Sequence, residues 1–113
     1  MSVNNYLTSI EREKREIETH RRYITRYQGD IKDWREDIKS EREKAKRQMA
    51  YAKDRVAKSR IRDQRDRIID RLKSKIDRAK EEIDSKRERI SRCREDIKGY
   101  REKIRDIKKR KRR

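Results

Sequence analysis

The residue types that most often carry chemistry are scarce in this chain, which has one histidine, His20, and one cysteine, Cys93. A single histidine can supply neither a histidine-based triad nor a cluster of histidine metal ligands. Arg92 and Arg94 flank Cys93 and could lower its pKa, which would favour a nucleophilic thiolate. The simpler interpretation is that His20 and Cys93 both lie in the contact between two helices. His20 would then be a tolerated polar residue and Cys93 a small buried one. The sequence therefore predicts no catalytic residue, no metal site and no cofactor.

Paired carboxylates are the remaining candidates for catalysis. Asp33 and Asp37 have the spacing of neighbours on one face of a helix, and Glu81 and Glu82 are adjacent in the sequence. General acid–base chemistry needs carboxylates held in an apolar pocket that shifts their pKa values, and the sequence around these pairs is polar. A glycine-rich phosphate-binding loop is also missing from the sequence. We therefore expect a protein that is not an enzyme and has no small-molecule substrate.

Basic residues are the dominant chemical feature, and they are unevenly distributed. The chain carries a net charge of +17, and residues 42–67 contain 11 basic but only 4 acidic residues. The last six residues, 108–113, are all basic. Clusters of this kind gain free energy when a polyanion binds and releases its counterions. The residues predicted to contact a polyanion are Lys44, Lys46, Arg47, Lys53, Arg55, Lys58, Arg60, Arg62, Lys108, Lys109, Arg110, Lys111, Arg112 and Arg113.

The sequence contains no element that reads bases. It has no zinc-finger spacing, no aromatic RNA-stacking signature and no helix-turn-helix with a glycine turn. Any binding to nucleic acid is therefore expected to involve phosphates and to be indifferent to base sequence.

Two series of apolar residues with a seven-residue period predict the helices that carry these side chains. The first series is Val3, Ile10, Ile17, Ile24, Ile31 and Ile38, continuing weakly as Ala45 and Ala52; the second is Ile69, Ile76, Ile83, Ile90, Ile97 and Ile104. A sustained period of seven is typical of a coiled coil, in which one stripe of each helix faces a partner. The residues predicted to form this seam are Ile10, Ile17, Ile24, Ile31, Trp34, Ile38, Ile69, Leu72, Ile76, Ile83, Ile90, Ile97 and Ile104. Tyr23 and Tyr51 fall beside the seam and could cover it or contact a third helix.

The two series are out of phase, because 31 residues separate Ile38 from Ile69. We therefore predict an all-α fold in which the chain turns near residues 53–60 and forms an antiparallel helical hairpin. Its arms span about 3–52 and 61–107 of a single coiled-coil domain (1–107), followed by a basic C-terminal tail (108–113). In this hairpin the numbers of two facing residues sum to about 110. The candidate helix caps are Thr8 with Glu11 for the first arm, and Ser59 or Asp63 for the second.

One continuous helix that pairs in parallel with a second copy is the alternative. Residues 44–62 contain neither glycine nor proline and are rich in good helix formers, which favours this alternative. However, residues 53–68 would then contribute little to the seam.

The composition predicts a helical protein of an intracellular compartment, either the cytoplasm or the nucleoid or nucleus, without membrane insertion. Of its 113 residues 56% are charged, and a single cysteine fits a reducing environment. We expect a structural or adaptor protein that associates with itself or with another helical protein and contacts a polyanion, most plausibly nucleic acid. The alternatives are a purely protein-binding adaptor and a component packed inside a virion or filament. In shape and composition the chain resembles the small basic hairpins of bacterial secretion stalks.

Overall fold

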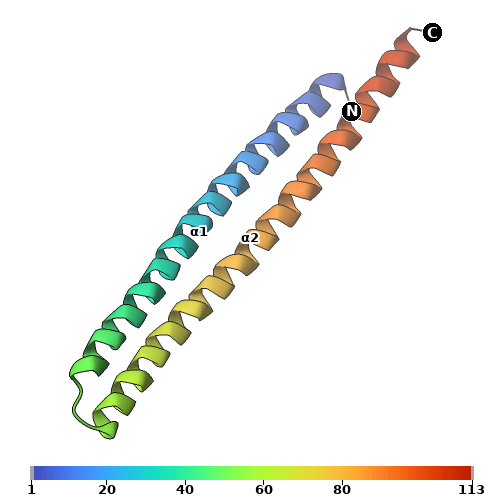
Figure 1. Cartoon of the computed structure of the whole chain (residues 1–113). Coiled ribbons are helices and arrows are strands. Elements are labelled where there is room, and N and C mark those ends of the chain that lie inside the picture. Colours follow the sequence, from blue (N-terminus) through green and yellow to red (C-terminus); the bar gives the residue numbers. More distant parts are fainter. Residues whose placement is uncertain (1, 113) are drawn as a thin grey trace. The chain divides into compact units, whose positions relative to one another are not determined.

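The structure, a computed structural model, describes residues 2–112 and contains two helices. Helix α1 spans Val3–Tyr51 and helix α2 spans Arg55–Lys111, and no strand occurs within residues 2–112. Figure 1 shows α1 and α2 joined by one short turn. The prediction of an all-α fold is therefore confirmed. None of the helices in this described part of the chain combines the length and apolar character needed to cross a membrane.

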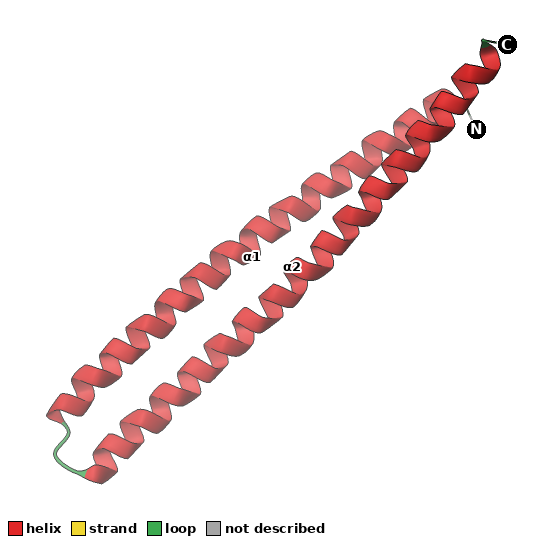
Figure 2. Ribbon diagram, turned by 45° about the vertical axis from the view of Figure 1, so that its right-hand side comes forward, coloured by secondary structure: helices red, strands yellow, loops and turns green. Residues whose placement is uncertain are grey.

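The chain reverses direction at residues 52–54, drawn as the green loop between the red helices in Figure 2. The predicted antiparallel helical hairpin is confirmed, and the alternative of one continuous helix is wrong. The turn lies at the start of the predicted interval, since residues 55–60 already belong to α2. The amide of Ala52 donates to the carbonyl of Met49 at 3.3 Å, an i to i−3 bond that tightens the last turn of α1.

Asp54 explains why α2 begins so early. Its Oδ1 accepts a hydrogen bond of 2.7 Å from the amide of Ala57, the third residue of the helix, as an N-cap side chain does. Ser59 and Asp63, the predicted caps, lie inside α2 instead. The start of α1 is organised similarly, because Ser2 Oγ accepts from the amide of Asn5 at 3.3 Å. The predicted capping residue Thr8 is already helical, and its hydroxyl donates to the carbonyl of Asn4.

Contacts between residues divide the chain into two compact units, and the single domain over residues 1–107 stays a prediction. Unit 1 combines the residues up to Thr25 with those from Ile83 onward, and unit 2 comprises Arg26–Glu82. Each unit contains one segment of α1 packed against one segment of α2.

The core of unit 1 is an interleaved row of side chains from both segments. Ile10 and Ile17 of α1 pack with four residues of α2: Ile90, Cys93, Ile97 and Ile104. The exposed fractions of these six residues lie between 4% and 8%. Val3, Tyr6, Ile24 and Tyr100 are half-buried against this row. The rings of Tyr6 and Tyr100 lie 5.9 Å apart, and Lys86 Nζ lies 5.1 Å from the ring centre of Tyr23. The residue numbers of these two pairs sum to 106 and 109, close to the sum of 110 that the predicted register gives.

The core of unit 2 continues the same pattern up to the turn. Its buried residues are Ile31, Ile38, Ala45, Ile69, Ile76 and Ala79, with Trp34 and Leu72 half-buried. Nearer the turn, Ala57, Ile61 and Arg65 are half-buried at intervals of four residues. Ile61 and Arg65 line one small cavity together with Ala45. Next to the turn, the half-buried positions of α2 are thus spaced by four residues, whereas farther along α2 the spacing alternates between three and four.

Ile90 provides a test of the seam, since it is 6% exposed in the core of unit 1. We expect Ile90→Ala to lower the free energy of unfolding by about 2–4 kcal/mol, through reduced burial and the cavity that it leaves. Arg87→Ala, at an exposed position one turn away, should cost less than about 0.5 kcal/mol in the same chemical denaturation experiment. Equal destabilisation by the two variants would contradict the assignment of the seam.

Candidate nucleic-acid interface

Eight of the predicted polyanion-binding residues lie close to the turn in unit 2, and we call them the turn cluster. Three come from α1, one from the turn and four from α2: Lys44, Lys46, Arg47, Lys53, Arg55, Lys58, Arg60 and Arg62. All eight side chains are exposed. The antiparallel fold thus gathers, at one turn, charges that are up to 18 residues apart in the sequence.

Helical spacing arranges most of the turn cluster in two stripes. Lys44 and Arg47 are three residues apart on α1, so they share one face of that helix. Arg55, Lys58 and Arg62 share one face of α2 by the same rule, at intervals of three and four residues. Neighbours at these spacings have Cβ atoms about 5–6 Å apart. Each stripe therefore presents adjacent cationic groups, as contact with successive phosphates requires.

The positive charge of the turn cluster exceeds the negative charge of its surroundings, since residues 42–67 contain 11 basic and 4 acidic residues. The only acidic residue within 44–62 is Asp54, whose carboxylate accepts the bond from the amide of Ala57 and keeps its negative charge. Four further acidic residues flank this interval: Glu41, Glu43, Asp63 and Asp66. Across residues 2–112 the ion pairs involve Lys14, Arg22, Arg65 and Arg92, none of which belongs to the turn cluster. The cluster therefore keeps its positive field available for an anion.

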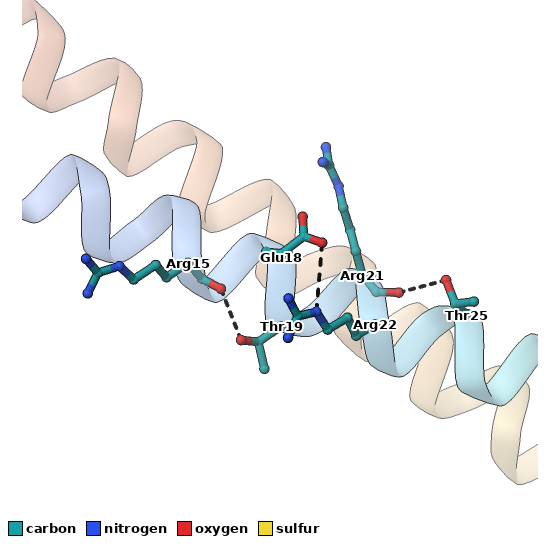
Figure 3. Close-up of polar contacts among 6 residues, drawn as sticks. All are labelled: Arg15, Glu18, Thr19, Arg21, Arg22 and Thr25. Atoms are coloured by element: carbon teal, nitrogen blue, oxygen red, sulfur yellow. Dashed lines mark hydrogen bonds and ion pairs between the residues drawn. The ribbon is translucent and has the colours of Figure 1, made fainter.

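The surface of unit 1 contrasts with the turn cluster because its charges alternate in sign. Arg22 Nε lies 3.9 Å from Glu18 (Figure 3), and Arg92 lies 2.9 Å from Glu88, as their spacing of four predicts. Glu11 pairs with Lys14 at 3.7 Å. Figure 3 also shows the Thr19 and Thr25 hydroxyls donating to carbonyls one turn earlier in α1. This surface satisfies its polar groups locally, which is typical of a solvated helix.

The second set of predicted polyanion-binding residues forms the terminal cluster, Lys108–Arg112. Lys108 through Lys111 occupy the last turn of α2, and all five side chains are exposed. Basic residues are favourable there because they interact with the negative end of the helix dipole. Arg113, which was also predicted to bind, lies outside the described residues. The red end of α2 projects past the start of α1 in Figure 1, so the described part of α1 does not face the terminal cluster.

Cys93 lies in a different environment from the one that its arginine neighbours suggest. It is 5% exposed, and its Sγ donates to Glu16 Oε2 at 3.5 Å. Burial, hydrogen bonds to Glu13 and Glu16 and the negative charge of both carboxylates raise its pKa from 9.0 to about 12. Cys93 is thus the small buried residue of the simpler interpretation. Arg92 and Arg94 do not lower its pKa, because burial and the facing carboxylates outweigh them. A thiol held neutral in this way is a poor nucleophile.

The same contact brings together three potential metal ligands that sequence reasoning missed. A carboxylate oxygen of Glu13, one of Glu16 and Cys93 Sγ all lie within 4.8 Å of one another. His20 Nδ1 is buried nearby on α1 and has no hydrogen-bond partner within residues 2–112. The signal available in the sequence was the register, which places Cys93 opposite residue 17 and hence beside Glu16. Of the described residues, this group is the one whose donor atoms could hold a cation.

Comparison of the chain with protein-family models, with curated proteins and with solved structures finds no match.

The raised pKa of Cys93 predicts slow alkylation in the folded protein. At pH 8 the folded chain should react with iodoacetamide roughly two to three orders of magnitude more slowly than the chain in denaturant, because so little thiolate is present. Mass spectrometry of quenched samples measures both rates. Because the folded state holds the proton more tightly, this group's contribution to stability is complete below pH 9 and is lost as the pH rises towards 12. Equal alkylation rates would contradict this environment.

Proposed function

We propose that this protein is a non-enzymatic, structural or adaptor helical hairpin that binds nucleic acid through its basic clusters. One observation carries the proposal: all eight side chains of the turn cluster are exposed, and Asp54 is the single acidic residue among them. A row of exposed and uncompensated cations displaces counterions from a phosphate backbone, which supplies the free energy of binding. The terminal cluster adds a second group of exposed cations.

The chemistry of the clusters supports binding without sequence preference. Lysine and arginine side chains on exposed helix faces contact phosphates and position a protein on its target, whereas discrimination needs groups that reach base edges. A protein acting in this way would work in a compartment that contains nucleic acid, the cytoplasm or the nucleoid or nucleus. Its partners would be the polyanion and, through its helices, further copies or other helical proteins.

Charge neutralisation tests the proposal by fluorescence anisotropy with a labelled DNA duplex over a series of salt concentrations. Replacing Arg55, Lys58, Arg60 and Arg62 with Gln should weaken binding, and replacing Lys108–Arg112 should also weaken it. For each duplex phosphate that a variant no longer neutralises, the slope of log K against log salt should fall in magnitude by up to about 0.9. Duplexes of different sequence should bind with similar affinity.

The matched control removes the same number of charges from unit 1. Arg12, Arg22, Arg87 and Arg101 lie on the surface where acidic neighbours alternate with basic residues, so their replacement with Gln should change affinity much less. Equal weakening by the turn-cluster and control variants would show that net charge alone decides binding. If the native protein does not bind DNA or RNA at about 50 mM salt, the proposal fails and the protein-binding adaptor replaces it.

A further inference from the structure

Tyr51 is the aromatic residue that the fold leaves most exposed. Tyr6, Tyr27, Trp34 and Tyr100 are half-buried on the seam, and Tyr23 lies under the Lys86 ammonium. Tyr51, in contrast, is 86% exposed at the last residue of α1. The sequence suggests that it could cover the seam, but the structure shows that it does not.

The position of Tyr51 connects it with the turn cluster. Lys44, Arg47 and Tyr51 have the spacing i, i+3 and i+7, so the ring continues the α1 stripe of the cluster. Lys53 and Arg55 follow within four residues, and the next large apolar side chain, Val56, is also 61% exposed. An aromatic face at the end of a cationic stripe is the combination with which proteins hold unpaired nucleotides, because phosphates meet the cations while a base stacks on the ring.

We propose that Tyr51 is a stacking platform for an unpaired nucleobase, so that the turn cluster binds single-stranded nucleic acid in preference to duplex. This inference rests on the proposed function, since the cations must first hold the backbone. In a duplex the base faces are covered by neighbouring bases, and the ring could reach one only after unstacking it. Every base has a π-face, so stacking adds affinity for single strands without adding sequence preference.

Three probes of equal length and label separate base stacking from phosphate contacts. They are a single-stranded DNA, the same backbone with abasic sites, and a duplex. Tyr51→Ala should weaken binding to the single strand roughly 5- to 100-fold, the range for removal of one stacked base. It should leave the abasic strand and the duplex within about twofold, because only phosphate contacts hold them. Tyr51→Trp should restore single-strand binding.

Tyr23→Ala is the matched control, since it removes another exposed tyrosine that lies in unit 1 and outside the turn cluster. It should leave binding to all three probes unchanged. Circular dichroism checks that each variant keeps its helix content, and the high exposure of Tyr51 means that its replacement removes little buried surface.

The outcomes distinguish this inference from the proposed function. If Tyr51→Ala affects none of the probes, or weakens all three equally, the stacking role is overturned while salt-dependent binding by the native protein still supports the clusters. Binding to anionic lipid vesicles that depends on Tyr51, with oligonucleotide binding unaffected, would overturn it in favour of a membrane surface. If the native protein binds none of the three probes at about 50 mM salt, the proposed function and the stacking role fail together.

Discussion

The burial of one apolar stripe on each helix is the interaction on which the rest of the structure depends. Only 28% of the residues are hydrophobic, and most of the isoleucines lie on the two seven-residue series. A single helix cannot remove such a stripe from water, so each segment of α1 needs a segment of α2. Within each unit the pairing covers the isoleucines well, leaving Ile10 of unit 1 at 4% and Ile76 of unit 2 at 6% exposure.

This constraint also decides what the surface can do. Because the seam uses most of the apolar side chains, most of the remaining positions carry charges, and we expect function to depend on how these charges are distributed. In unit 1 opposite charges alternate and form local pairs such as Arg92 with Glu88. Around the turn of unit 2 the cations are in excess, and Asp54 is engaged by the backbone. The proposed binding therefore follows from an imbalance of charge, and the fold contributes by gathering both sides of the turn.

The sequence predicts the hairpin because its evidence is periodic and extends over many residues. The phase change between Ile38 and Ile69 and the register near 110 both come from repeated spacing, so no single residue decides them. The limits of the turn depend on single residues, and they were predicted less well. Good helix formers on both sides of residues 52–54 conceal the break, and the capping bond from Ala57 to Asp54 is a local geometry that composition does not reveal.

The candidate site was predictable to a similar degree. Counting charges along the sequence identifies the turn cluster and the terminal cluster. Their side chains are exposed because a hairpin of two helices has no interior that could bury excess cations. The environment of Cys93 was not predictable from its neighbours in sequence, because Glu13 and Glu16 reach it from the other helix and outweigh Arg92 and Arg94. The exposure of Tyr51 likewise depends on where α1 ends, which the seven-residue period does not determine.

Intramolecular crosslinking most directly tests the central claim that α1 and α2 of the same chain pair in antiparallel orientation. Tyr6 and Tyr100, whose rings lie 5.9 Å apart, would be replaced by cysteines in a Cys93→Ser background and treated with a short thiol crosslinker at high dilution. The hairpin predicts a crosslinked monomer whose yield does not depend on protein concentration. Crosslinks that form only between chains, with a yield that rises with concentration, would contradict it.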